Sequence, residues 1–369
     1  MNAYLHIPFC ASICSYCDFS SWAGEDSKIP SYVQALQREI GGSDLPGPLR
    51  TVYFGGGTPS TLAPTELEKI LAALEGQAGF APGLEITMEV NPEGAEPAKL
   101  EAYRALGVNR ISLGAQAAQT ELLEALGRRH GWDGVEAAVR AVKAVGFPTF
   151  NLDLMLGLPK QTSTQWDESL EKALALLPGH LSLYGLQVEP GTPLAGQVDR
   201  GLLVPDEDAQ ADLYGRAQAV LAREGYLQYE VSNFSKPGQE CLHNLAVWRG
   251  EDYWGFGVSA VGTVGWERRS NTDRLEAYLA AGGDRAQAHH LEPLTAALRT
   301  REKMILGLRL AEGVAESELR ASGVLPDQLE VLVARGFFTR RNGRIAPVSG
   351  SFFTLHGGLT RLWPGTGTF

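Results

Sequence analysis

Residues 4–19 of this 369-residue chain read YLHIPFCASICSYCDF and place Cys10, Cys14 and Cys17 in C-x3-C-x2-C spacing. Three of the four cysteines in the sequence therefore lie within eight positions, directly after an apolar run that indicates a strand. Iron–sulfur clusters are held by cysteine thiolates on tight loops, and three thiolates leave one corner of a four-iron cluster open. We therefore predict that these cysteines hold a [4Fe-4S] cluster whose open iron binds a small molecule.

Two other uses of the three cysteines have weaker support. A structural zinc site has four ligands, and His6 is able to complete a Cys3His set, because Cys241 lies far along the chain. A disulfide needs an oxidising compartment, and no basic and apolar leader precedes the first predicted strand. The same observation predicts a cytoplasmic protein.

The composition argues against two classes of partner. Apolar residues make up 44% of the chain, but no stretch reaches the roughly eighteen uninterrupted apolar residues of a membrane span. The net charge is −11, and basic residues cluster only in short pairs such as 268–269 and 340–341. Binding to a nucleic-acid backbone needs clustered Lys and Arg, so we predict no nucleic-acid partner.

Apolar or β-branched runs alternate with amphipathic helical patterns along the first half of the chain. Strands connected by helices form parallel sheets, so six such units predict an α/β fold with a partial (β/α)6 barrel. In such barrels the active site lies at the carboxyl ends of the strands. The predicted strands are residues 3–7, 51–54, 85–90, 110–113, 149–154 and 181–187, and the predicted helices include 30–40, 64–74 and 132–145.

The residues that follow the second and third predicted strands suit a ligand site. The glycine triplet at 55–57 is unfavourable inside a strand, but it exposes backbone N–H and C=O groups to a ligand, and Thr58 adds a hydroxyl. Alone, such a triplet usually indicates only a turn. Glu89 ends the third strand and is able to bind a ribose diol, the alternative being a solvated carboxylate.

The fourth and fifth strands bring further polar side chains to the same edge. Gln116 is an amide at a strand end, and Arg128 is a planar donor for a carboxylate. Asp153 lies in an otherwise apolar run, where an isolated carboxylate is costly, so it is predicted to be paired or to face a ligand.

Together these motifs resemble the oxygen-independent coproporphyrinogen III oxidase family of radical S-adenosylmethionine (SAM) proteins, and within it the branch of heme chaperones. The likeness runs from about residue 2 to residue 310. It is carried by the cysteine segment, by residues 55–59, and by the sequences EVNP (89–92), GVNRISLG (107–114), DLMLGLP (153–159) and YEVSNF (229–234).

The resemblance implies a role for each matching position. Cys10, Cys14 and Cys17 would bind the [4Fe-4S] cluster, and Tyr4 would lie against the SAM site. The family positions that contact SAM or a second SAM-like ligand are matched by Gly56, Gly57, Thr58, Glu89, Gln116, Arg128 and Asp153.

An aromatic-rich region between residues 225 and 261 is the predicted heme site. Aromatic rings stack on a flat macrocycle and imidazole binds iron, although a hydrogen-bonded histidine in a filled core produces the same pattern. The resembled family has an H-N-x-x-Y-W motif implicated in heme binding, and this chain has His243 and Trp248 with Val247 in place of the tyrosine. Losing one aromatic contact costs about 0.5–1.5 kcal/mol. The turn at 255–262 also lacks the Pro and the His that the family has there.

The last segment predicts a small winged-helix-like domain with a docking or lid role. Helices are predicted at 299–310, 316–321 and 326–334, and strands at 336–339 and 344–346 joined across Arg341, Asn342 and Gly343 as an Asn-Gly hairpin. Residues 364–369 are predicted to be a loose tail. The predicted domains are 1–225, the radical-SAM barrel; 226–293, an aromatic-rich α+β extension; and 294–369, the winged-helix-like domain with its tail.

Two functions follow from the resemblance. The first is a heme chaperone that binds heme and delivers it to a client haemoprotein, either as a monomer or as a homodimer. The alternative is a coproporphyrinogen III oxidase, an enzyme that decarboxylates propionate side chains by radical chemistry. Oxidases of the family resemble C-x3-C-x2-C-x-C after an N-terminal extension, whereas Phe19 stands at the last position here and the first cysteine is already residue 10. These differences favour the chaperone and leave enzymatic activity open.

Overall fold

The computed structural model describes residues 1–284, 289–348, 350 and 354–363. Among these residues a twelve-stranded sheet has the order β14-β13-β12-β11-β1-β4-β5-β6-β7-β8-β10-β9. The six central strands are parallel and follow one another along the chain, which confirms the predicted barrel strands. They are β1 (Asn2–Ile7), β4 (Leu49–Gly56), β5 (Phe80–Val90), β6 (Arg110–Gln116), β7 (Thr149–Leu156) and β8 (His180–Gly185).

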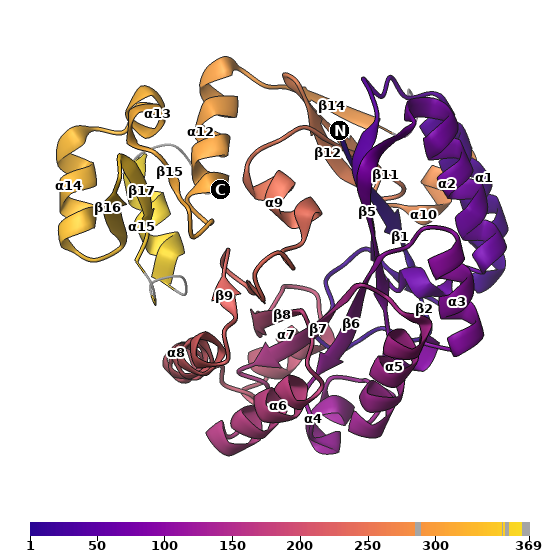
Figure 1. Cartoon of the computed structure of the whole chain (residues 1–369), viewed down its shortest axis with the longest axis horizontal. Helices are drawn as coiled ribbons and strands as arrows, with labels where there is room; N and C mark the ends of the chain where they lie inside the picture. Colours follow the sequence, from indigo (N-terminus) through magenta and orange to yellow (C-terminus); the bar gives the residue numbers. More distant parts are fainter. Residues whose placement is uncertain (285–288, 349, 351–353, 364–369) are drawn as a thin grey trace.

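Helices cover the convex face of the curved sheet, and its concave face stays open as a partial barrel (Figure 1). The main covering helices are α1 (Ile29–Gly41), α2 (Pro64–Ala78), α3 (Pro97–Ala105), α5 (Trp132–Val145), α6 (Ser163–Ala175) and α8 (Glu207–Arg223). Two short helices, α4 (Thr120–Ala125) and α7 (Pro193–Asp199), follow the carboxyl ends of β6 and β8.

Side chains on the parallel strands alternate between an apolar outer face and a polar inner face. In β5, Met88 belongs to the core beneath the helices, whereas Thr87 and Glu89 line the concave side. In β7, Leu152 is buried in the same core, whereas Asp153 lines the concave side. Because successive strand residues point to opposite faces, this pattern packs the outer layer and leaves polar groups inside the barrel.

Residues 226–293 extend both edges of this sheet. On one edge, β9 (Leu227–Gln228) and β10 (Asn233–Ser235) continue from β8 in antiparallel pairing. On the other edge, β11 (Tyr253–Phe256) is parallel to β1, followed by β12 (Val261–Val264), β13 (Glu267–Asn271), α10 (Leu275–Ala281) and β14 (His289–Pro293). The segment that the sequence set apart as an extension therefore shares its hydrogen bonds with the barrel, and the three domain boundaries stay a prediction.

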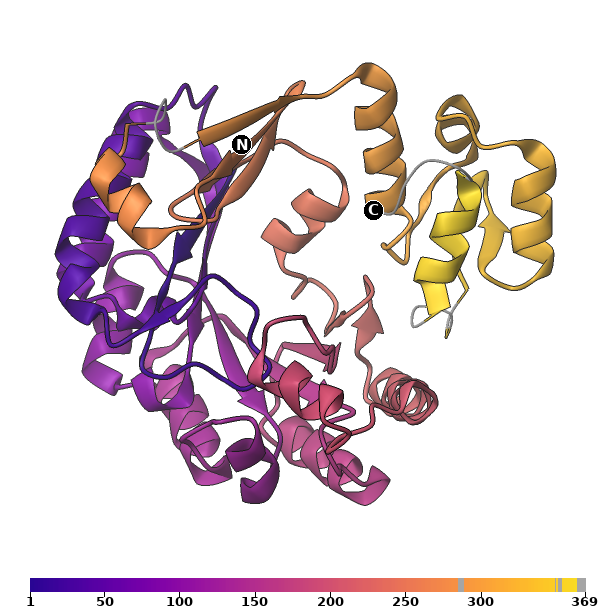
Figure 2. The same ribbon diagram turned by 180° about the vertical axis from the view of Figure 1, so that it is seen from behind.

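Helix α9 (Leu242–Trp248) lies on the concave side of the sheet in both views (Figures 1 and 2). The Glu85 carboxylate of β5 accepts hydrogen bonds from the backbone N–H groups of Leu242 (3.1 Å) and His243 (3.0 Å). Helix N-termini leave such N–H groups without intrahelical partners, so Glu85 fixes where this helix begins.

The C-terminal part begins with α12 (Ala296–Gly307). This helix starts earlier than predicted because the Thr295 side chain accepts a hydrogen bond from the backbone N–H of Leu298 (3.2 Å) and caps it. Beyond it lie β15 (Val314–Ala315), α13 (Glu316–Ala321), α14 (Pro326–Ala334), β16 (Phe338–Arg341), β17 (Arg344–Pro347) and α15 (Leu355–Leu362). We call the described residues from 314 to 363 the C-terminal module.

The hairpin predicted in this module is confirmed. Arg341 pairs with Arg344, and the Asn342 and Gly343 between them have φ values of +50° and +73°, as a two-residue turn requires. The likeness to a winged helix stays a prediction, and the predicted tail at 364–369 lies outside the described residues. Within the described ranges, none of the helices is both long and apolar enough to cross a membrane.

A buried carboxylate joins the barrel to the edge strands. Glu39 of α1 is 1% exposed and accepts hydrogen bonds from the Tyr278 hydroxyl (2.6 Å), the Asn271 amide (2.7 Å) and the Gly257 backbone N–H (2.9 Å). These three donors come from α10, β13 and the segment after β11, so one side chain joins all three segments to α1.

We expect Glu39→Ala to lower the free energy of unfolding by at least about 3 kcal/mol, because three buried donors lose their acceptor at once. Glu39→Gln keeps one acceptor oxygen and should cost clearly less. Urea unfolding followed by circular dichroism measures both variants. Equal stability of Glu39→Ala and the unmodified protein would contradict this role.

Candidate functional site

A cavity of about 1100 Å³ extends from the cysteine loop along the concave side of the barrel. It is lined by the three predicted cluster cysteines and by every residue predicted to contact SAM except Tyr4. These lining residues are Cys10, Cys14, Cys17, Gly56, Gly57, Thr58, Glu89, Gln116, Arg128 and Asp153. The structure therefore brings together residues from β2 (Phe9–Cys10), β4, β5, β6, β7 and the loops that follow them.

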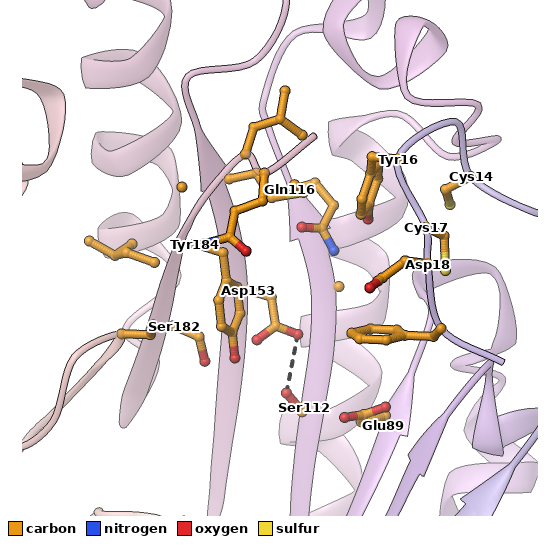
Figure 3. A pocket seen from close by; sticks show the side chains of 18 of the residues that line it. Cys14, Tyr16, Cys17, Asp18, Glu89, Ser112, Gln116, Asp153, Ser182 and Tyr184 are labelled. Atoms are coloured by element: carbon orange, nitrogen blue, oxygen red, sulfur yellow. Dashed lines mark hydrogen bonds between the residues drawn. The ribbon is translucent and has the colours of Figure 1, made fainter. Parts of the chain in front are cut away.

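The cysteine loop is fixed by backbone contacts with its neighbours. It leaves β2 (Phe9–Cys10), which pairs with β3 (Trp22–Ala23). The backbone N–H of Ser15 donates to the Leu126 carbonyl (3.0 Å), and the Ser15 carbonyl accepts from the N–H of Leu194 (2.9 Å). All three cysteines are free thiols, and Figure 3 shows Cys14 and Cys17 on the loop that borders the cavity.

The glycine triplet packs directly against this loop. A Cβ atom on Gly57 would lie 2.9 Å from the Cys10 sulfur, and one on Gly56, whose φ is +116°, would lie 2.7 Å from the His6 ring. The Thr58 hydroxyl contacts the Cys10 sulfur at 3.5 Å. Only glycine fits at these two positions: Gly57 packs against the cysteine loop and Gly56 against the His6 ring of β1.

The alternative of a Cys3His zinc site is not supported. Both ring nitrogens of His6 are engaged, Nε2 with the Ser20 carbonyl (2.7 Å) and Nδ1 with the Tyr4 hydroxyl (3.2 Å). Within the described part of the chain, no three His, Cys, Asp or Glu side chains are arranged to hold one metal ion. A four-iron cluster has a separate corner for each thiolate, so three free thiols around one cavity fit it without meeting at a point.

Arg128 links the cysteine loop to the end of β5. Its Nη1 donates to the Asn91 side-chain oxygen (2.8 Å), and its Nη2 donates to the Tyr16 hydroxyl (2.9 Å). Its buried Nε has no hydrogen-bond partner among the described residues, which leaves a donor free for a ligand. Burial raises the pKa of the Cys14 thiol, and the positive charge of Arg128 opposes this and favours the thiolate that iron requires.

Gln116 reaches the cavity through an irregularity in β6. Its φ is +64°, and the register with β7 shifts between Gly114 and Gln116. A Cβ atom on Gly114 would lie 3.0 Å from the Gln116 side-chain nitrogen. A bulge redirects a side chain at the cost of local strain, and here it directs Gln116 into the cavity.

Two carboxylates lie on neighbouring parts of the cavity wall (Figure 3). Burial raises the pKa of Glu89 to about 7, and the negative charge of Asp153 raises it further. The hydrogen bond that Glu89 accepts from the Tyr53 hydroxyl (2.8 Å) opposes this rise. Asp153 accepts hydrogen bonds from Asn151 (2.7 Å) and Ser112 (3.3 Å), and burial raises its pKa as well. Paired acceptors of this kind suit the hydroxyl or ammonium groups of a ligand.

Two predicted residues do not line the cavity. Tyr4 stacks behind Tyr53, with ring centroids 6.2 Å apart. His243 is 5% exposed, and its Nδ1 is 2.9 Å from the Thr51 hydroxyl. Burial lowers the pKa of His243 to about 3, so its ring is neutral. Because the ring is buried and does not line the cavity, α9 has to move before His243 can bind iron, so its role as heme ligand stays a prediction.

The sequence reasoning missed most of the inner wall. Polar side chains that line the cavity come from alternate positions of the parallel strands, as in Ser112, Asn151, His180 and Ser182. The signal was present, because each strand alternates polar and apolar residues with a period of two. The C-terminal module adds Leu355, His356 and Leu359 to the lining, and neither strand period nor motif indicated these.

Comparison with known families agrees with the fold and the cysteine site. The Radical SAM superfamily profile matches residues 4–173. Fold and site thus define a radical SAM protein, a class whose members carry a [4Fe-4S] cluster and SAM. The solved structure of coproporphyrinogen III oxidase HemN from Escherichia coli shares the fold, with a TM-score of 0.84, 24% identity, and coverage of 98% of this chain and 89% of that one.

Curated relatives give the narrower assignment. Heme chaperone HemW from Synechocystis sp. is 40% identical over 338 residues, 86% of this chain and 80% of the relative. Heme chaperone HemW from Bacillus subtilis is 34% identical over 348 residues, 91% of this chain and 92% of the relative. The chain belongs to the HemW family of radical SAM proteins.

We expect the stability of the protein to fall as pH rises through about 7, because the pKa of Glu89 is raised to about 7 from an ordinary 4.5. The contribution of the protonated form is complete below pH 4.5 and lost above pH 7, and it amounts to at most about 3 kcal/mol. Glu89→Gln should remove this slope. Thermal unfolding of cluster-free protein between pH 5 and 8 measures it.

The substitution Glu171→Gln, at an exposed position of α6, controls for the change in net charge. Identical pH profiles for Glu89→Gln and the unmodified protein would show that Glu89 is not perturbed.

Proposed function

We propose that this chain is a heme chaperone, which binds heme and delivers it to a client haemoprotein in the cytoplasm. The observation that carries the proposal is its likeness to heme chaperones HemW over most of both chains, at 34–40% identity for the relatives from Synechocystis sp. and Bacillus subtilis. A match that extends through the C-terminal part supports the function of the whole protein rather than that of the barrel alone.

Within this proposal, Cys10, Cys14 and Cys17 hold the [4Fe-4S] cluster, and its open iron binds SAM. The cluster supplies one-electron chemistry to whatever binds its open iron. The residues that bind and orient SAM are Gly56, Gly57, Thr58, Glu89, Gln116, Arg128 and Asp153, with Tyr4 packed behind them. The free Nε of Arg128 and the two carboxylates offer a donor for a carboxylate and acceptors for hydroxyl or ammonium groups.

The extent of the cavity supports a second ligand. The cavity measures about 1100 Å³, slightly above the roughly 300–1,000 Å³ of small-molecule pockets. Its lining continues from the cysteine loop past Tyr184 to Leu359 of α15. We therefore assign the end that lies away from the cysteines to heme. His243 as axial ligand, a homodimer and the lack of a nucleic-acid partner stay predictions from the sequence.

We expect Cys14→Ser to abolish binding of the four-iron cluster, because a serine hydroxyl replaces a thiolate ligand. Cys241→Ser is the matched control: this fourth cysteine is 2% exposed, and its sulfur contacts the Glu85 carboxylate at 3.5 Å. Iron and sulfide analysis after anaerobic reconstitution measures both variants. A full cluster in Cys14→Ser would contradict the assignment of the cysteine loop.

We expect the reconstituted protein to bind heme stoichiometrically and to release no carbon dioxide from coproporphyrinogen III under reducing conditions with SAM. A heme titration followed by absorbance and a product assay run on the same preparation separate the two candidate functions. Decarboxylated product would establish the oxidase, whereas a protein that neither binds heme nor forms product would refute both.

A further inference from the structure

We propose that His356 on α15 binds the iron of heme and that Arg309 binds one of its propionates, so that heme lies between the barrel and the C-terminal module. The proposal rests on the proposed function for the identity of the ligand, and it names the residues that hold it. Four observations carry it: the state of the other histidines, the position of α15, the surroundings of Arg309 and the contacts of α9.

An axial histidine needs an accessible ring nitrogen that faces a cavity large enough for the macrocycle. Two histidines of the barrel interior lack such a nitrogen because both nitrogens of each ring lie within hydrogen-bond distance of other groups. His6 contacts the Ser20 carbonyl and the Tyr4 hydroxyl. His180 contacts the Asn151 side-chain oxygen (2.7 Å) and the Tyr229 hydroxyl (2.8 Å).

Three further histidines fail on burial or position. His130 and His243 are 7% and 5% exposed and do not line the cavity. His290 is exposed but belongs to β14, the edge strand at the opposite end of the sheet from β8. Among the histidines whose side chains the structure describes, His356 is the one that is both exposed and part of the cavity lining.

Helix α15 presents His356 to the cavity on a firmly packed base. Leu355, Leu359 and Leu362 of the same helix are at most 3% exposed and belong to the hydrophobic core. Leu355 and Leu359 also border the cavity beside His356, which gives an apolar wall for the flat face of a macrocycle. In the described part of the chain, no hydrogen bond or ion pair involves the His356 ring.

Arg309 provides a positive charge on the same cavity. Its guanidinium lies over the Trp248 ring at 5.4 Å from the centroid, and its buried Nε has no hydrogen-bond partner among the described residues. Burial lowers the pKa of Arg309, although nearby Glu230 opposes this. A half-buried guanidinium with an unused Nε donor suits a carboxylate, which is the group that heme carries on its rim.

This arrangement gives the H-N-x-x-V-W segment a positioning role. Trp248 at its end stacks against Arg309, and Asn244 lines the cavity, whereas His243 points to Thr51. The hydrogen bonds from Glu85 hold α9 in this place. The helix thus presents Arg309 to the cavity without supplying the iron ligand.

A heme titration of anaerobically reconstituted full-length protein tests the proposal, using His356→Ala, Arg309→Gln, and His290→Ala as the matched control. We expect His356→Ala to weaken binding by at least about tenfold, the equivalent of about 1.4 kcal/mol, and to shift the Soret band because the axial ligand is lost. Arg309→Gln should weaken binding without moving the band. His290→Ala should leave both readouts unchanged.

The possible outcomes separate this inference from the function on which it rests. If His356→Ala binds heme with the affinity and spectrum of the unmodified protein, or if His243→Ala alone loses the band, His356 is not the ligand. If the unmodified protein does not bind heme, the proposed function fails, and this inference fails with it. Far-ultraviolet circular dichroism of each variant confirms that it is folded before its titration is interpreted.

Discussion

The alternation of side chains along six parallel strands is the constraint on which the rest of the structure depends. Most of their apolar residues face the covering helices, so burial on that side holds the sheet together. The concave side is left with carboxylates, amides, hydroxyls and the guanidinium groups of Arg110, Arg128 and Arg309. Burying these polar groups without partners costs free energy, so they either hydrogen-bond to one another or stay available to solvent or a ligand.

The bonds within this inner wall show which groups are already satisfied. Near the amino ends of the strands, Asn2, Thr51 and His243 form one hydrogen-bonded chain. Nearer the carboxyl ends, Arg128 keeps an unused donor, and Glu89 has a raised pKa. Polar groups in the interior are therefore hydrogen-bonded to one another near the amino ends of the strands and left available to a ligand near the carboxyl ends. The cysteine loop lies at the carboxyl ends.

The sequence predicted the strands, the cysteine loop and the strand-end residues because each has a local signature. Cys10 and Gly57 are an example: their spacing indicated a cluster loop and a bare backbone, and the structure shows that a methyl group on Gly57 would collide with the Cys10 sulfur. The bulge at Gln116 and the partners of Arg128 depend on which strands become neighbours, and no local pattern records that. The strands of the inner wall alternate polar and apolar residues with a period of two, but strands with one face exposed to solvent show the same pattern.

Residues far apart in the sequence were the hardest to predict. His243 lies in a segment whose aromatic content suited both a heme ligand and a packed core, and only its contact with Thr51 shows that the ring is engaged. His356 lies in a short helix that no periodicity in its surroundings indicated, and its relation to Arg309 exists only after the chain has folded back on the barrel.

The cavity takes part of its wall from α15, which follows the barrel by more than a hundred residues in the chain. A ligand in a cavity walled by one rigid domain can leave only through the opening of that cavity. Here one side of the cavity belongs to the C-terminal module beyond α12 (Figure 2), so on the proposed function a movement of this module away from the barrel would open the heme end of the cavity. On the proposed function, a recipient protein would then replace the module as one wall of the cavity, and heme would reach it without passing through solvent.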